Sequence, residues 1–388
     1  MLNYFKIILV FCLVVTDLFS QKNDSLSLKS KYNPKISAIS DSNIIFSSKK
    51  HLIENDTLQQ AKLNIGGYVS SYFAYYDDDT EQNGFVQFPT MAARNKQFGL
   101  NMALIDMQYV SKNIRSNLGI HFGDIPQSVW SKQYNVIQEA NAGIKLIKHL
   151  WFDAGFFRSH IGVESSQPRE NITSSMTLVN FYEPYFLAGM KLTYEVNSKL
   201  SIQVNSFNSL NSFVDNNKNK FVGTSIVYQP TNNLSLTYNF ITGTETPDSV
   251  KTKQQRYYNN FYLTYTSAKI LIAAEANYGL QTHSLKSDLT KNASMYSGLI
   301  VLKYQAIKKF AVYGREEFFS DYNQILTGAT NISHSVYGTT AGFEYKPFTK
   351  VALSLEGRLL QSENLIFVQG NKVTNYRNEL IFCLDVWF

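Results

Sequence analysis

The feature that most constrains the fold is a long succession of segments in which apolar and polar residues alternate. Within 349–361, for example, Leu353 and Leu355 alternate with Ser354 and Glu356. Successive side chains of a strand point to opposite faces, so each segment predicts a strand with one apolar and one polar face. Sixteen such segments lie at approximately 62–76, 96–110, 113–123, 137–147, 149–159, 184–196, 199–208, 220–229, 233–243, 256–266, 269–280, 294–305, 308–319, 334–346, 349–361 and 375–388.

The connections between these segments alternate in length. Turn-like stretches such as 111–113 and 197–198 follow every second segment, whereas 77–95 and 282–293 are longer and polar. Membrane barrels have short turns at one rim and longer loops at the other. No segment reaches the ~20 apolar residues of a transmembrane helix, and in a membrane a closed barrel is the other way to satisfy the backbone. The sequence therefore predicts an all-β, antiparallel up-and-down transmembrane barrel of about 16 strands over 62–388.

The N-terminal residues predict export. Lys6 precedes an unbroken apolar run over 7–15, and Ser20 is a small residue suited to a cleavage site. Nine apolar residues are too few to span a bilayer, so 1–20 is expected to be a signal peptide. Residues 21–61 are rich in Ser, Lys and Asn and predict a disordered periplasmic lead-in, either a plain linker or a docking arm.

The last thirteen residues, 376–388, form a strand with two different faces. Phe382 and Phe388 belong to the apolar set, whereas Arg377 and Glu379 belong to the polar set. A last strand that ends on Phe resembles the closing strand of Gram-negative outer-membrane barrels. The likeness implies that the apolar face contacts outer-membrane lipid and that the barrel-assembly machinery recognises this strand. Closure then requires the strand to pair with 62–76.

The first half of the predicted barrel resembles the OmpL-like porin-2 family of outer-membrane β-barrels. Residues 67–75 (GYVSSYFAY) are similar to the opening strand of that family. Residues 153–157 (DAGFF), with Gly162 and Glu164 behind them, are similar to its D-A-G-x-F…G-x-E pattern. The resemblance implies a passive outer-membrane channel for small hydrophilic solutes.

A third similarity to this family lies in the longest connection and the strand after it. Residues 171–174, followed by Pro184 and Gly189, resemble its N…S segment and its P…G strand. Ser175 stands where the family usually carries Arg, which puts the role of that basic group in doubt here. In the general porins the third external loop folds into the lumen. Residues 160–183 are long enough to do so, but a loop that caps the barrel from outside fits the sequence as well.

The polar face of each predicted strand is expected to line the lumen, because Lys or Arg at the lipid midplane would cost about 2–4 kcal/mol. Many of these charges are expected to pair across neighbouring strands. Seven basic and eight acidic groups predict weak ion preference. Exchange of Arg115, Arg315 and Arg377 for Glu is expected to shift selectivity toward cations. The predicted pore-lining residues are Arg115, His121, Asp153, Lys191, Glu195, Glu275, Lys303, Arg315, Glu317, Glu344, Lys346, Glu356, Arg358, Arg377, Glu379 and Asp385.

Catalytic, metal and cofactor sites are not indicated. The six His residues are scattered, and neither an H-E-x-x-H nor a G-x-S-x-G motif occurs. Three consecutive acids at 77–79 are interpreted as solvated loop charge rather than a Ca²⁺ site. Cys383 is the only cysteine beyond the predicted signal peptide, so no internal disulfide is expected. The formal charge of +6 is spread along the chain, so no nucleic-acid partner is expected.

Taken together, these patterns predict a non-enzymatic, porin-like channel of the outer membrane. The alternative is a non-conducting surface barrel whose extracellular loops bind a ligand or partner. An outer-membrane enzyme is a more distant option. The sequence leaves open whether several copies assemble into a homo-oligomer.

Overall fold

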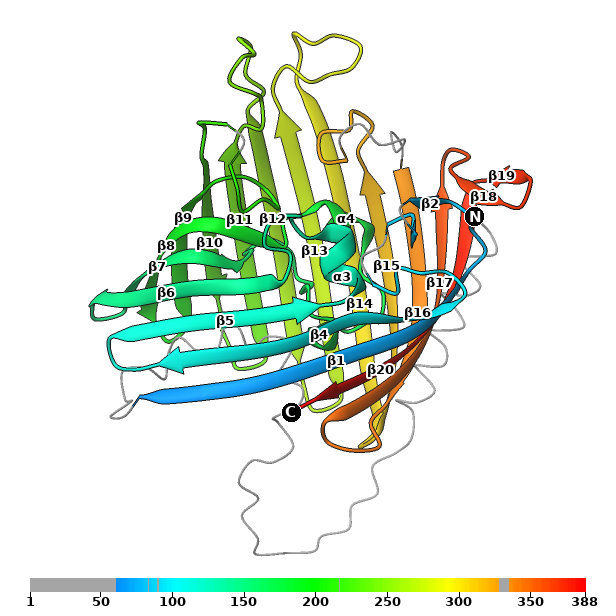
Figure 1. Cartoon of the computed structure of the whole chain (residues 1–388), viewed down its shortest axis with the longest axis horizontal. Helices are drawn as coiled ribbons and strands as arrows, with labels where there is room; N and C mark the ends of the chain where they lie inside the picture. The colour runs from blue at the N-terminus through cyan, green and yellow to red at the C-terminus, as the bar shows by residue number, and fades with distance from the viewer. Residues whose placement is uncertain (1–60, 83, 89–90, 216, 328–334) are drawn as a thin grey trace, which may run out of the picture. The chain divides into compact units, whose positions relative to one another are not determined.

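A closed antiparallel barrel of sixteen strands accounts for most of the chain, which confirms the predicted fold class (Figure 1). The computed structural model describes residues 61–388, except 83, 89–90, 216 and 328–334. The predicted signal peptide and all but the last residue of the lead-in lie outside this part. The barrel strands are β1 (Lys62–Tyr76), β4 (Gln97–Val110), β5 (Ile114–Phe122), β6 (Ile137–Ile147), β7 (Leu150–Arg158), β8 (Phe186–Asn197), β9 (Leu200–Phe207), β10 (Phe221–Tyr228), β11 (Leu234–Gly243), β12 (Arg256–Thr266), β13 (Ile270–Gln281), β14 (Ala293–Ile307), β15 (Phe310–Ser320), β16 (Ser335–Tyr345), β17 (Val351–Ser362) and β20 (Tyr376–Trp387).

Several connections contain short elements that the sequence patterns did not predict. No helix among the described residues is long and apolar enough to cross a membrane. Figure 1 shows α3 and α4 inside the ring of strands. The short elements are the hairpins β2 (Glu81–Gln82) with β3 (Phe85–Val86) and β18 (Phe367–Gln369) with β19 (Lys372–Thr374), the helices α3 (Asp124–Val129) and α4 (Leu178–Tyr182), and the 3₁₀ turn η2 (Pro168–Glu170).

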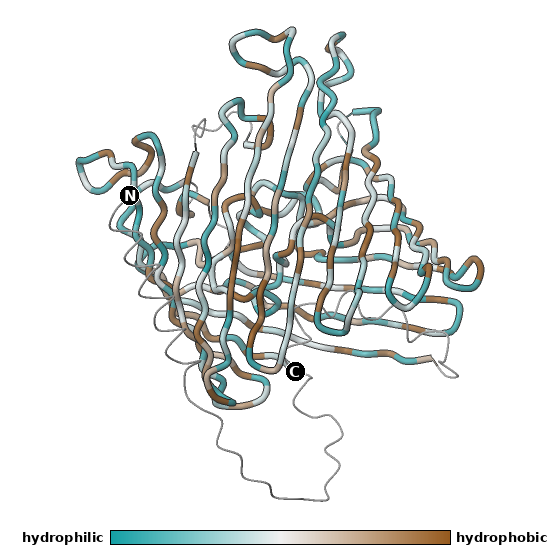
Figure 2. The backbone as a smooth tube through the Cα atoms, turned by 180° about the vertical axis from the view of Figure 1, so that it is seen from behind, coloured by the Kyte–Doolittle hydropathy of each residue, from teal (hydrophilic) through white to brown (hydrophobic). Residues whose placement is uncertain are grey.

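The outer wall carries two belts of exposed aromatic side chains. Figure 2 shows apolar and polar residues alternating along the strands, with more polar residues in the long loops. Aromatic girdles at both interfaces flank the apolar band of a membrane barrel. The belt near the short turns contains Tyr109, Tyr194, Tyr228, Tyr265, Tyr345 and Phe388, and the belt near the long loops contains Tyr75, Phe98, Phe122, Tyr257, Tyr278, Tyr296, Tyr337 and Tyr376.

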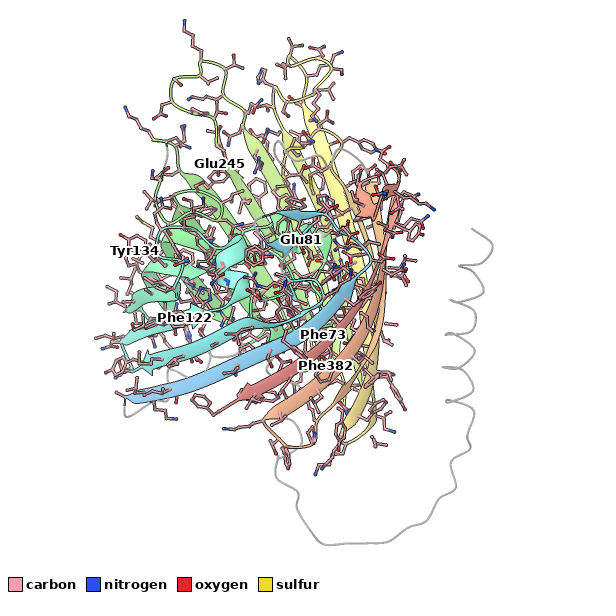
Figure 3. The ribbon with its side chains drawn as sticks, turned by 45° about the vertical axis from the view of Figure 1, so that its right-hand side comes forward. Phe73, Glu81, Phe122, Tyr134, Glu245 and Phe382 are labelled. Atoms are coloured by element: carbon pink, nitrogen blue, oxygen red, sulfur yellow. The ribbon has the colours of Figure 1, made fainter. Side chains whose placement is uncertain are left out.

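The barrel closes between β1 and β20, as the sequence predicts. Their register runs from Tyr68 opposite Trp387 to Tyr76 opposite Glu379. Phe388 extends the ladder, because Gly67 and Phe388 exchange backbone hydrogen bonds of 3.3 and 3.0 Å. Figure 3 labels Phe73 and Phe382, which face each other across this seam.

The terminal Phe388 ring occupies the space that a side chain at residue 67 would fill. A Cβ atom on Gly67 would overlap this ring. We predict that Gly67→Val displaces the ring and destabilises the barrel by about 1–3 kcal/mol, as overpacking does. Gly357→Val is the matched control, because the nearest atom to a Cβ there is 4.0 Å away. Urea unfolding midpoints of the refolded barrels test the prediction, and equal midpoints for the two variants would contradict it.

Toward the long loops, the barrel interior contains an apolar cluster of buried side chains. Buried side chains from many strands, including Phe207, Phe221 and Phe319, pack with Leu178 and Val179 of α4. Tyr182 stacks on Phe319 with ring centroids 5.4 Å apart. Large aromatic side chains bury much apolar area, so this half of the barrel has a packed core.

Candidate functional site in the barrel lumen

The connection 160–183, whose placement the sequence left open, lies inside the barrel. Its backbone and side chains contact strands on several sides of the wall. The Gly162 amide donates to Asn260 Oδ1 on β12 at 3.2 Å, and the Arg169 amide donates to the Tyr68 hydroxyl on β1 at 3.1 Å. We call residues 160–183 the lumenal loop.

Wall carboxylates hold the lumenal loop through its backbone amides. Glu275 Oε2 accepts from the Val163 amide at 2.6 Å. Glu356 accepts from two consecutive amides, those of Ser174 at 2.6 Å and Ser175 at 3.0 Å. Glu317 Oε2 accepts from the amide of Leu178 at 2.8 Å. Hydrogen bonds to a charged acceptor are stronger than neutral ones, so these glutamates anchor the loop.

Arg315 on β15 joins the wall to the same loop through its guanidinium group. Its Nη1 lies 3.0 Å from Glu164 Oε1 and 2.7 Å from both Thr173 Oγ1 and the Ser175 carbonyl. Its Nη2 donates to Ser175 Oγ at 2.8 Å. The side chain of Arg315 therefore contacts Ser175. This is the position at which the OmpL-like porin-2 family, which the sequence resembles, usually carries Arg.

Arg315 also begins a chain of alternating charges with members on β15, β17 and β20. It approaches Glu317, which pairs with Arg358 on β17. Arg358 lies 3.6 Å from Glu379 on β20, the residue opposite it in the ladder. Arg377 continues the chain, with Glu379 at 2.6 Å and Asp78 at 3.3 Å. Each charge has an opposite neighbour, which offsets the cost of burying it.

The interpretation of residues 77–79 as solvated loop charge was wrong for Asp78. The Asp78 side chain has no exposed surface. Its Oδ1 accepts from the Val368 amide at 2.9 Å, and Asp79 Oδ2 accepts from the Gly370 amide at 2.8 Å. Asp78 and Asp79 join the first long loop to the last long loop, because the seam between β1 and β20 brings these two loops together.

We predict that Asp78→Ala destabilises the barrel by about 2–3 kcal/mol, because Arg377 loses a charged partner and the Val368 amide loses its acceptor. Urea unfolding followed by tryptophan fluorescence measures the loss. Asp288→Ala is the control, since Asp288 lies in an exposed turn beside Lys291. A midpoint for Asp78→Ala equal to that of the control would refute a role in closing the seam.

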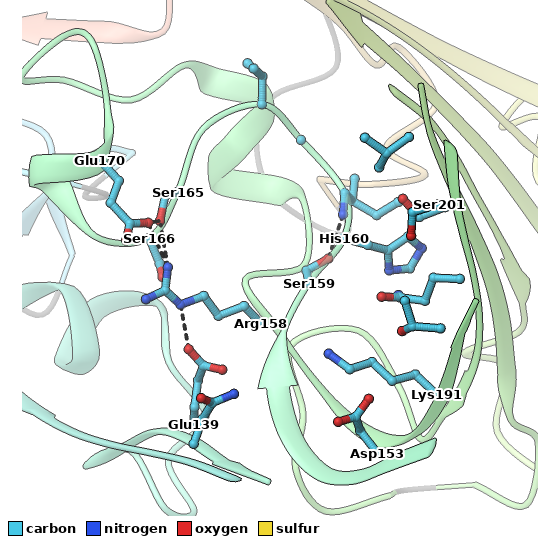
Figure 4. Close-up of a pocket in the computed structure, with 18 of the residues that line it drawn as sticks. Glu139, Asp153, Arg158, Ser159, His160, Ser165, Ser166, Glu170, Lys191 and Ser201 are labelled. Atoms are coloured by element: carbon cyan, nitrogen blue, oxygen red, sulfur yellow. Dashed lines mark hydrogen bonds and ion pairs between the residues drawn. The ribbon is translucent and has the colours of Figure 1, made fainter. Parts of the chain in front are cut away.

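A cavity of about 440 Å³ occupies the lumen on the short-turn side of the lumenal loop. It extends from Val110 and Asn197, near the short turns, to Gly162 and Arg169 on the loop. A second cavity of about 40 Å³ lies beneath the loop beside Arg169 and Asp385. Figure 4 shows charged and hydroxyl side chains around the larger cavity.

The predicted pore-lining charges outside the alternating chain lie in smaller clusters. Arg115 binds Asp153 through two nitrogens, one of them at 2.6 Å. Glu344 lies 2.7 Å from Lys303 and 3.5 Å from Lys346. Asp385 accepts a hydrogen bond from the Tyr68 hydroxyl at 2.7 Å. Glu195 lies 3.9 Å from His149. The Lys191 amine lies 4.7 Å from the centroid of the Phe157 ring.

His121 is placed differently from the other predicted pore-lining residues. Its side chain has no exposed surface and packs edge-on against Trp130, with ring centroids 4.7 Å apart. Trp130 follows α3, which folds into the barrel and covers this part of the wall. His121 contacts an aromatic core instead of open lumen.

Several residues of the lumen were missed by the sequence patterns. Arg158 pairs with Glu139 and Glu170, each at 2.7 Å. Strand alternation gives Arg158 the parity of outward residues, so it was not predicted to lie in the lumen. Gly155, three residues before it in β7, has a φ of 123°. Glu139 lies two residues before Asn141, whose side chain points inward. Strand alternation could therefore have placed Glu139 in the lumen from the sequence alone.

Burial also perturbs one acid of the lumenal loop. Glu183 accepts a hydrogen bond from the Tyr258 hydroxyl at 2.5 Å and is almost fully buried. Burial, and secondarily the nearby carboxylate of Glu275, raises the pKa of Glu183 well above its usual range. The proton is therefore held more tightly here than on a solvated carboxyl group.

The closed barrel with an inward-folded loop defines the class of outer-membrane porins. Residues 62–388 match the model of the family described as "Putative beta-barrel porin-2, OmpL-like", and the chain belongs to this family. The match covers the whole barrel and confirms the family to which three short motifs pointed. No curated protein matches the sequence.

Solved porin structures share the fold at low sequence identity. The outer-membrane channel DcaP of Acinetobacter baumannii is 10% identical, with a TM-score of 0.60 over 84% of this chain and 97% of that one. An anion-selective porin from Comamonas acidovorans is 9% identical, with a TM-score of 0.59 over 85% and 100%. OmpF of Salmonella typhi, in complex with daunomycin, is 12% identical, with a TM-score of 0.56 over 84% and 98%.

Proposed function

We propose that the protein is an outer-membrane channel through which small hydrophilic solutes diffuse passively. The observation that carries the proposal is the polar cavity of about 440 Å³ in the lumen of a sixteen-stranded barrel. Barrels of 16–18 strands are wide enough for an aqueous channel, whereas eight-stranded ones fill with side chains. The protein performs no chemistry on the solute in this proposal. Of the residues predicted from the sequence to line the pore, Arg115, Asp153, Lys191 and Glu195 line this cavity.

The lumenal loop sets the size limit of the proposed channel. It crosses the lumen and is held by Glu275, Glu317 and Glu356 from three strands. A loop anchored at several points narrows the cross-section more permanently than a mobile loop would. Sieving and hydration, rather than a high-affinity site, then govern passage.

Liposome swelling tests this proposal directly. Proteoliposomes that contain the refolded protein should swell in isotonic arabinose faster than in an isotonic disaccharide, because the narrowed lumen admits the smaller sugar more readily. Empty liposomes are the control. Absence of swelling in every sugar, with the barrel shown to be folded by its heat-modifiable mobility, would exclude the diffusion function.

A non-conducting barrel is the second candidate function, and one observation favours it. The apolar cluster around α4 lies inside the barrel near the long loops. If it closes the lumen completely, the long loops would serve to bind a ligand or partner. The swelling assay separates the two functions.

Assembly with other molecules follows from the same proposal. The two aromatic belts are suited to outer-membrane lipid interfaces, and the strand that ends on Phe388 is suited to recognition by the barrel-assembly machinery. One of the similar solved structures, OmpT of Vibrio cholerae, is described in a trimer form. A homo-oligomer is accordingly part of the proposal.

A further inference from the structure

The short turns at one rim of the barrel carry positive charge in a regular pattern. Seven short connections join strands at this rim, from β4–β5 to β16–β17, and all seven lie in the described part of the chain. Six of the seven contain an exposed lysine, and none contains Asp or Glu. We use the name lysine rim for the exposed lysines of these turns and of the start of β1, which are Lys62, Lys112, Lys148, Lys199, Lys269, Lys308, Lys309 and Lys350.

The carboxylates on the strands near these turns face the lumen and do not neutralise the lysine rim. Glu344, for example, lies 2.7 Å from Lys303 of the inner wall. In the part of the chain that the structure describes, no ion pair joins a lysine of the rim to an acid. The acids that line the two lumenal cavities from these strand ends are Asp106, Asp153, Glu195, Glu344 and Asp385.

The opposite end of the barrel has a different charge pattern. Its long loops contain exposed lysines beside acids, such as Lys96 with Asp79 at 3.9 Å and Lys291 with Asp288 at 3.2 Å. Mixed charges of this kind satisfy each other within the loop. A rim of one sign instead creates a positive potential that attracts an anionic partner.

The lysine rim lies directly beyond the aromatic belt near the short turns. Tyr109 of this belt comes three residues before Lys112, and Tyr265 comes four residues before Lys269. Tyrosine rings of such belts lie at the level of the lipid headgroups. A lysine near the end of a membrane-spanning element extends its flexible stem so that its amine reaches this level. The rim amines are therefore within reach of lipid phosphates.

From this arrangement we propose that the lysine rim binds the phosphate groups of anionic lipids in the leaflet that surrounds the short turns. Lysine is a point-charge ligand for phosphate, and each lysine near an anionic membrane surface strengthens attraction to it. Because the lysines occur in turns around most of the circumference, the rim binds a ring of lipids instead of one molecule. The inference concerns the membrane partner and does not depend on whether the barrel conducts.

Electron spin resonance of spin-labelled lipids tests the proposal on the unmodified protein, refolded in phosphatidylcholine vesicles. Spin-labelled phosphatidylglycerol should associate with the barrel about fivefold more strongly than spin-labelled phosphatidylcholine, the preference expected for one lysine beside each headgroup. In 1 M NaCl the preference should largely disappear, because charges are then screened over about 3 Å. Equal association of the two lipids at low salt would overturn the proposal.

A rim variant and a matched control locate the preference on the barrel. Both remove six exposed lysines, and Lys309 is kept because its amine donates to the Pro347 carbonyl at 2.8 Å. The rim variant combines Lys112→Gln, Lys148→Gln, Lys199→Gln, Lys269→Gln, Lys308→Gln and Lys350→Gln. The control removes the same charge from the long loops through Lys132→Gln, Lys218→Gln, Lys251→Gln, Lys286→Gln, Lys291→Gln and Lys372→Gln.

The rim variant should lose at least half of the preference for phosphatidylglycerol, whereas the control should retain it. The same six rim positions changed to Arg should also retain it, since the charge is kept. Equal losses in the rim variant and the control would overturn the assignment to the short turns. Heat-modifiable mobility shows that each barrel is folded, and the salt dependence of the unmodified protein decides the question even if a variant fails to fold.

Discussion

Replacing residues 163–178 with a short Gly-Ser linker should raise the single-channel conductance by roughly threefold, because a barrel of this size has an aqueous lumen once its interior is cleared. The loop crosses the lumen and contacts β12, β13, β15 and β17 through its backbone amides. The replacement also removes Leu178 from the apolar cluster. Planar-bilayer recordings in KCl measure the change.

The matched control for this replacement is an equivalent trimming of 286–290, part of an exposed turn at the long-loop end. That change leaves the lumen untouched and should leave conductance within experimental error. If the lumenal replacement and the control gave the same conductance, the loop would not be the constriction.

Arg315→Ala should produce the largest loss of stability among single substitutions, about 3–5 kcal/mol, because it breaks buried ion pairs. The Arg315 side chain has no exposed surface and contacts both Glu164 of the loop and Glu317 of the wall. Its removal leaves Glu164 without this partner and releases Thr173 and Ser175. The urea midpoint should fall, and channel conductance should become larger and noisier as the loop detaches.

Lys291→Ala controls for the loss of an ion pair as such. Lys291 is 68% exposed and lies 3.2 Å from Asp288, so solvent screens the pair and its loss should not move the midpoint. A midpoint for Arg315→Ala that matched this control would show that the buried network does not hold the loop. A lower midpoint with unchanged conductance would show that it stabilises the wall without restraining the loop.

The architecture was predictable from the sequence because its signals are local. Period-two alternation defines each strand, and turn residues such as those at 111–113 define the short connections. Even the weakly alternating segments 137–147 and 220–229 correspond to β6 and β10. In an up-and-down barrel with an even number of strands, the first and last strands are antiparallel and can pair. The pairing of β1 with β20 was therefore predictable from the strand count.

The functional interior was harder to predict, because it depends on contacts between residues far apart in the chain. Alternation placed Arg315 and Arg377 on the inward face but could not show that other lumenal groups cover them. Of the three arginines whose exchange was expected to alter selectivity, Arg115 retains the most exposed side chain, at 14%. Arg169 escaped notice because it lies on a loop, where strand parity carries no information.

The apolar cluster near the long loops was also missed, for a related physical reason. Alternation assigns a residue to the inner or outer face but does not say whether the inner face meets water or another side chain. Inward aromatics such as Phe207 and Phe221 stack on each other, with ring centroids 5.6 Å apart, beneath the long loops. They belong to the same packed cluster as Leu178 and Val179 of α4, which folds inward.

Single-channel recording of the purified, folded protein in a planar bilayer distinguishes a conducting barrel from a closed one. We expect stepwise current increments that are linear in voltage near zero and proportional to KCl concentration, because ions diffuse through a hydrated lumen in the proposed channel. A folded, inserted barrel that shows no current steps at any voltage or salt concentration would contradict it.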